Sequence, residues 1–225
     1  MPFVLGITGS IGCGKSTVTR LLGELGALTL DADRLAREIL APGTPGLAAV
    51  VARFGPEILS AATPAQLDRR ALAERVFADP AARRDLEAIV HPGVYRAMAE
   101  ALDHWERTSR PDGPCIAALE IPLLMETNAD ALCDLIVVVA CGDRQWERLA
   151  NRAGMSGTSL RRVMEQQLPE AEKRLRAHWV IDNGGGPEAA GWQARRLWDE
   201  VLRRAGARDA GRAWPDRWRA WGAWP

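Results

Sequence analysis

The sequence predicts an α/β fold in which a parallel β-sheet of about five strands lies between two layers of helices. Short apolar runs alternate along the chain with stretches of helical periodicity, as repeated βαβ units require. The most strand-like run, residues 135–140, is β-branched and apolar on both faces, which is typical of a central strand in a parallel sheet. The chain has 225 residues, 47% of them apolar, and this suits one α/β domain with a small inserted lid.

The first expected strand, residues 3–7, leads into Gly9-Ser-Ile-Gly-Cys-Gly-Lys-Ser-Thr17, and a run with helical spacing follows. Gly-x-x-x-x-Gly-Lys-Ser between a strand and a helix is the P-loop pattern, so the fold class is P-loop NTPase-type with three layers. The backbone N–H groups of such a loop hold the phosphates of a nucleotide. The expected ATP contacts here are Gly12, Cys13, Gly14, Lys15, Ser16 and Thr17, with Lys15 on the β- and γ-phosphates and the Ser16 hydroxyl on Mg²⁺.

The rest of the first half contains one more strand and several helices. Helix 16–25 ends at Gly26, and strand 27–30 leads to Asp31-Ala-Asp33. Asp33 is well placed as the N-cap or first-turn acid of the next helix. Asp79-Pro80 predicts a helix start, whereas His91-Pro92 predicts a break between two helices. The expected helices are 34–40, 47–54, 66–77, 80–90 and 94–108, with a loop at 42–46 and a turn-rich stretch at 55–65.

The second half alternates strands and helices again after a loop at 111–114. Residues 115–119 predict a buried strand that ends at Glu120, and 179–182 predict the last strand. The tail carries four tryptophans, and we interpret it as a variable, partly disordered extension, with docking on the body or on a partner as the alternative. The expected helices are 143–151, 154–167, 169–178 and 191–205, the P-loop domain is 1–206 and the tail is 207–225.

The charge balance and the cysteines limit the class of protein. Basic and acidic residues both number 29, so nothing indicates a bulk nucleic-acid or membrane binder. The apolar runs are too short to cross a bilayer, and the N-terminus is unlike a signal peptide. The four cysteines show no C-x-x-C pair, so we expect reduced thiols in a cytoplasmic protein. For Cys13 the alternatives are an oxidisable thiol and, as we favour, a small residue at a variable loop position.

Acids and arginines outside the P-loop favour a small-molecule kinase. A GTPase needs Asn-Lys-x-Asp, which this chain lacks. Asp31 and Asp33 lie at the edge of the sheet where ligands bind, and an extended backbone would send both carboxylates to one side. One would accept the proton of an acceptor hydroxyl while the other supports Mg²⁺. The alternative is that Asp33 only caps its helix.

Three arginines and a histidine complete the candidates. Arg144, Arg148 and Arg152 recur every four residues and would share one helix face, as a lid closing over polyphosphate requires. The alternative is a solvated arginine face in a chain with only two lysines, Lys15 and Lys173. His91 is either a structural histidine or part of an acceptor pocket.

With these residues in view, the chain resembles dephospho-CoA kinases from Phe3 to about Gly186. The P-loop is generic, but Asp-Ala-Asp, His-Pro and Ile-Pro-Leu-Leu in that order are specific together. The motifs are Ile7 to Thr17, Asp31-Ala-Asp33 with Ala36-Arg37, Leu67 to Leu72 with Val76-Phe77, Ile89-Val-His-Pro92, Ile121-Pro-Leu-Leu124 with Glu126, Arg148-x-x-x-Arg152, Gln167-Leu-Pro169 with Glu172-Lys173, and Val180-Ile-Asp-Asn183.

The resemblance implies that ATP phosphorylates the ribose 3′-hydroxyl of dephospho-CoA, giving coenzyme A and ADP with Mg²⁺, in the last step of CoA synthesis. It implies a helical substrate region at 36–114 and a lid at 143–178, and it places Asn183 near the adenine. The implied roles are catalysis by Asp33, Lys15 and Arg148, ATP binding by the P-loop, Arg152 and Asn183, substrate binding by Asp31, Asp33, His91, Pro122 and Leu123, and metal binding by Ser16 and Glu120.

The sequence departs from the family pattern in several places. Glu120 stands where the family often has Asp, and Ala153 stands where an acid usually follows the lid arginine. The tail has no counterpart. We expect ATP and dephospho-CoA as partners, no nucleic acid or membrane, and a monomer or weak homo-oligomer. The alternatives are another small-molecule or nucleoside monophosphate kinase, and a P-loop regulatory module without rapid turnover.

Overall fold

The structure is a computed structural model, and it describes residues 2–61, 65–108, 114–150, 161, 164–185 and 187–206. The chain divides into two compact units. One comprises, among the described residues, those up to Asp31 and those from Leu102 to 206, and it holds the five-stranded sheet. The other comprises Ala32–Ala101 and is helical. The tail at 207–225, for which we predict partial disorder, lies outside the described residues.

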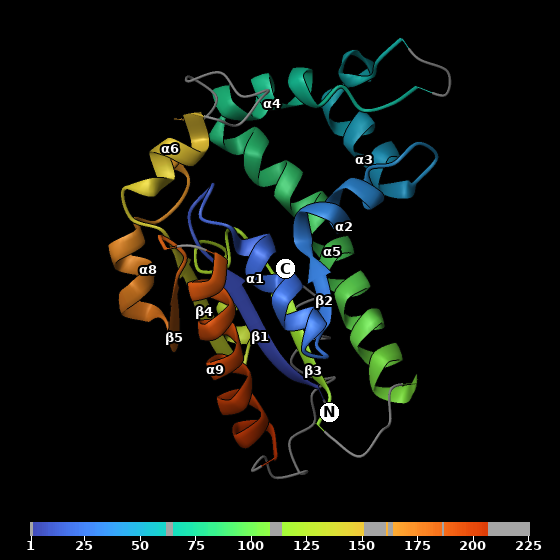
Figure 1. The fold of residues 1–225 in the computed structure, drawn as a ribbon. Helices are drawn as coiled ribbons and strands as arrows, with labels where there is room; N and C mark the ends of the chain where they lie inside the picture. Colours follow the sequence, from blue (N-terminus) through green and yellow to red (C-terminus); the bar gives the residue numbers. More distant parts are fainter. Residues whose placement is uncertain are drawn as a thin grey trace. The chain divides into compact units, whose positions relative to one another are not determined.

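The sheet has five parallel strands, as predicted (Figure 1). Their spatial order is β2-β3-β1-β4-β5, so β1 lies in the centre with β3 on one side and β4 on the other. The carboxyl end of β1 is therefore the point where the strand order reverses, which is where open α/β sheets bind ligands. The strands are β1 Phe3–Thr8, β2 Leu28–Asp31, β3 Ile116–Glu120, β4 Leu135–Ala140 and β5 Trp179–Asp182.

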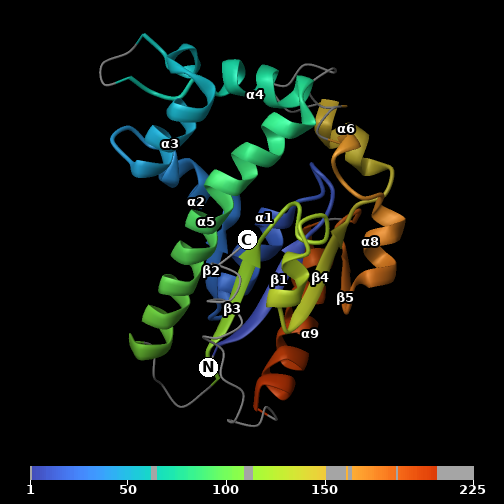
Figure 2. The same ribbon diagram turned by 180° about the vertical axis from the view of Figure 1, so that it is seen from behind.

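Alternate strand residues face a helical layer formed by α1, Lys15–Glu24, and α9, Pro187–Gly206 (Figures 1 and 2). The period of two sends every second side chain to this face, where the side chains form one apolar core. The core includes Phe3, Leu5 and Ile7 of β1, Leu135, Val137 and Val139 of β4, Val18 and Leu22 of α1, and Leu197 and Val201 of α9.

The opposite face of β1 is covered by the segment that follows β3. A Cβ atom on Gly6 would lie 2.6 Å from Cys133 Sγ and 2.8 Å from Leu124 Cδ2, so only glycine fits there. The short helix η2, Ala129–Leu132, belongs to this covering segment. Helices therefore lie on both faces of the sheet, and the P-loop fold predicted from the sequence is confirmed.

The helical unit is built from elements with recognisable start signals. Helix α3 begins where Thr44 Oγ1 accepts the N–H of Leu47 at 3.2 Å, and α4 begins at an Asp68 cap. Asp79 Oδ1 accepts the N–H of Ala81 at 2.8 Å, so the predicted start of a helix at Pro80 is confirmed. The elements are α2 Ala32–Ile39, α3 Pro45–Phe54, η1 Pro56–Ile58, α4 Arg69–Ala78 and α5 Pro80–Thr108, the last of which continues into the first unit.

The predicted break at His91-Pro92 is wrong, because α5 runs unbroken through Pro92 for 29 residues. Val90, Val94 and Met98 are all buried, so one apolar stripe continues past the proline at helical spacing. A proline removes only one N–H donor from a helix, and burial of this stripe on both sides of Pro92 offsets that loss. A proline is visible in the sequence as a single residue, whereas the apolar stripe on both sides of it has to be followed over several helical turns.

Among the described residues of the first unit, three more α-helices follow β4. They are α6 Arg144–Ala150, α8 Glu170–Arg176 and α9, which begins four residues before its predicted start at 191 because Pro187 suits a first helical turn. The predicted helix 154–167 lies mostly outside the described residues. Within the part of the chain that the structure describes, no helix combines the length and the apolar character needed to cross a membrane.

Candidate active site

The P-loop lies between β1 and α1, as predicted, and it closes around the ammonium group of Lys15. Lys15 is 9% exposed, and its Nζ donates to the carbonyl oxygens of Gly9 at 3.0 Å and Ser10 at 3.2 Å. Gly14 has a φ of +83°, and a Cβ atom there would collide with the side-chain nitrogen of Asn183. The lysine charge therefore lies inside the loop that holds phosphates in proteins with this pattern.

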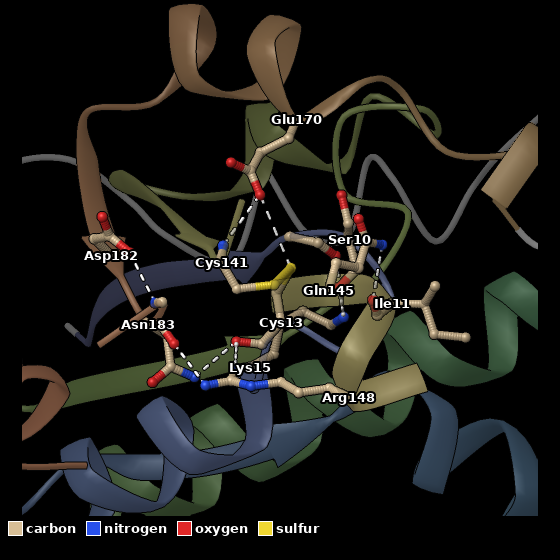
Figure 3. The surroundings of a disulfide bond; sticks show 12 residues. Ser10, Ile11, Cys13, Lys15, Cys141, Gln145, Arg148, Glu170, Asp182 and Asn183 are labelled. Atoms are coloured by element: carbon tan, nitrogen blue, oxygen red, sulfur yellow. Dashed lines mark hydrogen bonds between the residues drawn. A yellow bond between two sulfur atoms is a disulfide. The ribbon is translucent and has the colours of Figure 1, made fainter. Parts of the chain in front are cut away.

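Two predicted ATP-site residues converge on the carbonyl oxygen of Cys13 (Figure 3). The amide of Asn183 donates to this oxygen from Nδ2 at 2.8 Å, and Arg148 donates to it at 3.4 Å. Arg148 also donates to the backbone oxygen of Asn183 at 2.6 Å. Segments separated by 135 and 170 residues thus meet at the loop, because β1, β4 and β5 are neighbours in the sheet.

Residues that sequence reasoning missed fix the first half of the loop. Gln145 of α6 donates to the Ile11 carbonyl at 2.9 Å, and Gln167 accepts the Ile11 N–H at 3.0 Å. Leu149 packs over Gly12, where a Cβ atom would lie 3.0 Å from Cδ2 of the leucine. Gln167 belongs to the Gln167-Leu-Pro169 motif, for which the sequence predicted no role, whereas no motif marks Gln145. The place of Gln145 in the predicted lid region is the signal that could have indicated it.

Oxygen donors suited to a divalent cation lie at the ends of the strands beside the P-loop. Glu120 is the last residue of β3 and pairs in register with Ile7 of β1 and with Asp31 of β2. Ser16 and Glu120 line the same pocket, of about 530 Å³. A hydroxyl and carboxylates are ligands of the type that Mg²⁺ prefers, so the residues present fit this ion.

The expectation that Asp31 and Asp33 extend from one strand is wrong. Asp31 is the last residue of β2, and Ala32 already begins α2, so the backbone from 31 to 33 is not extended. Asp33 lies in the first turn of α2, where a carboxylate is stabilised by the helix N-terminus. The position of Asp33 in the first helical turn was predicted. The alternation of side chains along a strand, however, does not place the carboxylates of Asp31 and Asp33 on one side.

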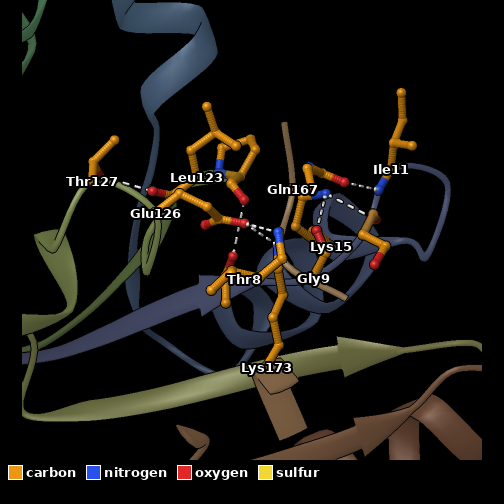
Figure 4. Close-up of polar contacts among 12 residues, drawn as sticks. Thr8, Gly9, Ile11, Lys15, Leu123, Glu126, Thr127, Gln167 and Lys173 are labelled. Carbon is orange, nitrogen blue, oxygen red and sulfur yellow. Dashed lines mark hydrogen bonds and ion pairs between the residues drawn. The ribbon is translucent and has the colours of Figure 1, made fainter. Parts of the chain in front are cut away.

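The loop after β3 is fixed by hydrogen bonds to β1 and by a buried ion pair (Figure 4). Thr8 donates from Oγ1 to the Pro122 carbonyl at 3.1 Å, and the Thr127 hydroxyl donates to the Leu123 carbonyl at 2.8 Å. Lys173 is fully buried, and its ammonium lies 2.9 Å from Oε1 of Glu126. Lys173, one of only two lysines in the chain, therefore connects α8 to the loop that holds Pro122 and Leu123.

His91, Arg144 and Arg152 are the remaining predicted residues. His91 lies on α5 in the helical unit, where its ring contacts Tyr95 edge to face at 5.9 Å between centroids. Burial lowers the pKa of His91 against a smaller opposing effect of Glu87. Arg144 is exposed at the start of α6, and Arg152 lies outside the described residues.

The expectation of four reduced thiols is wrong for two of the cysteines. Cys13 and Cys141 form a disulfide with a Cα–Cα distance of 5.1 Å, while Cys115 and Cys133 are not disulfide-bonded (Figure 3). The pair is 128 residues apart in the sequence, so spacing does not reveal it. It forms because Cys13 follows β1 and Cys141 follows β4, and these strands are hydrogen-bonded neighbours.

Comparison with known proteins agrees with this arrangement. The model of a protein family described as dephospho-CoA kinase matches residues 3–188. The chain belongs to the dephospho-CoA kinase family. A dephospho-CoA kinase of Anaeromyxobacter dehalogenans is 46% identical over 195 residues, which cover 86% of this chain and 90% of the relative. A dephospho-CoA kinase of Frankia casuarinae is 42% identical over 207 residues, which cover 92% of this chain and 86% of the relative.

Solved structures share the fold described above. A crystal structure from Thermus thermophilus matches with a TM-score of 0.73 and 36% identity, covering 90% of this chain and 97% of the other. The dephospho-CoA kinase from Campylobacter jejuni matches with a TM-score of 0.63 and 23% identity, covering 91% and 99%. At that identity the second match supports the fold alone.

Proposed function

We propose that this member of the dephospho-CoA kinase family transfers the γ-phosphoryl group of ATP to the ribose 3′-hydroxyl of dephospho-CoA, the last step of CoA synthesis. The convergence of Lys15, Arg148 and Asn183 on the P-loop, in a chain that matches the family over residues 3–188, carries this conclusion. Phosphoryl transfer requires positioning and charge stabilisation more than covalent chemistry, and this cluster of cations and backbone N–H groups suits that task.

The donor half of the reaction is assigned to the P-loop and the root of the lid. When ATP enters, the ammonium of Lys15 exchanges the Gly9 and Ser10 carbonyls for the β- and γ-phosphates. The Arg148 guanidinium, half-buried beside the Cys13 carbonyl, stabilises charge that develops on the transferred group. Arg152 and Asn183 complete the proposed ATP contacts, Asn183 through its place against Gly14.

The acceptor half is assigned to Asp33, with Asp31, His91, Pro122 and Leu123 as substrate contacts. Asp33 is exposed in the first turn of α2, directly after the strand that ends beside Glu120. A carboxylate there can orient the 3′-hydroxyl and take its proton as the bond to phosphorus forms. The helical region at 36–114 would hold the rest of the substrate, and 143–178 would act as the lid.

Mg²⁺ is the proposed cofactor, held by Ser16 and Glu120. With the ion held by these two side chains, its positive charge would neutralise the charge that builds up on the phosphate oxygens. Asp31, the register partner of Glu120, would support the site from β2. We also propose a cytoplasmic location. We propose a monomer or weak homo-oligomer, and sedimentation analysis would test this oligomeric state.

The deciding experiment follows ADP formation from ATP with dephospho-CoA, and with AMP, CMP and shikimate as competing acceptors. We expect turnover with dephospho-CoA and at least about 100-fold less with each competitor, because buried polar groups built for one acceptor reject the others. Preferred phosphorylation of AMP, CMP or shikimate would contradict the substrate assignment.

The role of Asp33 is tested by Asp33→Asn, with Asp199→Asn as the matched control on an exposed part of α9. Asp33→Asn should lower kcat by about 100-fold or more, in line with removal of a general base, while ATP binding stays within about twofold. Asp199→Asn should leave both quantities unchanged. Turnover like that of the unaltered protein in Asp33→Asn would remove Asp33 from this role.

A further inference from the structure

The disulfide joins the P-loop to the residue just before the proposed lid region, 143–178. Cys13 lies inside the loop, and Cys141 is the residue between β4 and the short turn that leads to α6. Gly142 follows with a φ of +51°, and a Cβ atom on it would meet nothing within 4 Å. The turn at Gly142 is thus both conformationally permissive and unpacked, which are properties of a hinge.

The second half of the proposed lid region also contacts the disulfide. Glu170, the first residue of α8, accepts the backbone N–H of Cys141 at 3.1 Å, and the same carboxylate oxygen lies 3.9 Å from Cys13 Sγ (Figure 3). The chain leaves the disulfide at Cys141 and returns to it at Glu170. Cys141 and Glu170, which flank most of the proposed lid region, therefore both lie beside the P-loop. Of these two links, only the Cys13–Cys141 bond is covalent, and it can be broken by reduction.

We propose that Cys13 and Cys141 are a reversible oxidation site that controls lid movement, the oxidised form turning over more slowly than the reduced form. The proposal rests on the lid role assigned above. In the oxidised form the P-loop and the lid root cannot separate beyond the reach of the S–S bond. In the reduced form no covalent bond holds them, and the hydrogen bonds of Gln145, Arg148 and Gln167 to the P-loop can exchange for water, so the lid can open to release product, a step that often limits kcat.

The Arg148 guanidinium and the N-terminus of α1 favour exchange at the Cys13 sulfur, whereas the Glu170 carboxylate, 3.9 Å from this sulfur, opposes formation of its thiolate. Cys13 lies just before the N-terminus of α1, and its carbonyl accepts a hydrogen bond from the Arg148 guanidinium. Positive charge at a helix N-terminus stabilises a thiolate, which makes a cysteine a better leaving group when its disulfide is attacked. Both sulfurs belong to buried residues, so the reagents that reach them are small.

The chemistry of both directions is complete with simple reagents. Hydrogen peroxide oxidises one thiolate to a sulfenic acid with loss of hydroxide, and the second thiol then displaces water to form the S–S bond. A small dithiol reverses this step. Its thiolate attacks one sulfur and releases the other cysteine as a thiolate, and its second thiol then frees the remaining cysteine and closes a cyclic disulfide.

The test compares the full-length protein after dithiothreitol with the same protein after hydrogen peroxide. Mass spectrometry of alkylated peptides measures the Cys13–Cys141 bond, and steady-state assays measure kcat and KM. We expect kcat of the oxidised form to be lower by about fivefold or more, with KM for ATP within about twofold, because opening and not binding is affected. Amide hydrogen exchange in 144–150 should be faster in the reduced form, a readout independent of activity.

Two variants separate this site from other thiols. Cys141→Ser should retain the activity of the reduced protein and lose sensitivity to peroxide. The double variant Cys115→Ser with Cys133→Ser should remain sensitive to peroxide. Equal kcat and equal exchange in the two redox forms would overturn the proposal, as would failure of dithiothreitol to break the bond in the native protein or peroxide sensitivity that persists in Cys141→Ser. Absence of kinase activity in the reduced protein with a clear exchange difference would instead contradict the proposed function.

Discussion

Replacement of Lys173 by Met tests how much the buried ion pair stabilises the sheet unit. Lys173 has no exposed side-chain surface, and Glu126 has 13%. One oxygen of Glu126 also accepts the N–H of Leu168 at 2.8 Å, and the other has no hydrogen-bond partner among the described residues. Removal of the ammonium therefore leaves a carboxylate that water reaches only in part.

The expected loss lies at the lower end of the range for a broken buried pair. Such losses are about 3–5 kcal/mol, and the partial exposure of Glu126 favours about 3 kcal/mol. For a chain of this size that corresponds to a fall in Tm of about 6–12 °C. Because an apolar pair can replace a buried ion pair at little cost, Lys173→Met combined with Glu126→Leu should recover most of the loss.

Urea unfolding followed by circular dichroism measures these free energies. Arg203→Met is the matched control, since its ion pair with Glu200 lies on the surface of α9 and should contribute less than about 1 kcal/mol. A loss below about 1 kcal/mol in Lys173→Met, or a double variant less stable than the single one, would refute the assignment of a buried, mutually dependent pair.

Two further predictions concern the P-loop and His91. Gly14→Ala should weaken ATP binding by about tenfold or more in calorimetry, because alanine is strained at positive φ and its Cβ would displace Asn183. Gly43→Ala, at a φ of +82° with open space around it, carries the same strain without that collision and should leave ATP affinity unchanged, so equal affinities in the two variants would contradict the collision. Burial lowers the pKa of His91 from its ordinary 6.5, so the unfolded chain binds this proton at higher pH, and stability falls as pH drops below about 6.5. His91→Gln should lose less stability between pH 7.5 and 5.5 than the unaltered protein in urea titrations, and identical slopes would show that His91 does not contribute.

The parts of the site that sequence predicted are those whose signal is local. The P-loop has its glycines, lysine and serine within nine residues, and β4 is a single unbroken apolar run, so both are visible without knowledge of the fold. Arg148 was predicted from the helical spacing of three arginines, and Asn183 came from the family resemblance. Their contacts with Cys13 depend on strand order, which local patterns do not encode.

The errors have the opposite origin. The disulfide and the contacts of Gln145 and Gln167 with Ile11 arise where distant segments meet, so no spacing rule detects them. The helix through Pro92 and the turn of the backbone after Asp31 are local features in which tertiary packing and helix initiation overrode simple rules about proline and strand alternation.

The strand order also has a consequence for the synthesis of the protein. The P-loop leaves the ribosome before β4, α6 and β5, which supply its neighbours and follow more than 100 residues later. Until Asn183 has been made, the carbonyl of Cys13 lacks the amide donor of Asn183, and the Arg148 guanidinium lacks the Asn183 backbone oxygen to which it donates. The nucleotide loop is thus completed only after synthesis has passed Asn183, and tight ATP binding becomes a signature of a chain that extends beyond this residue.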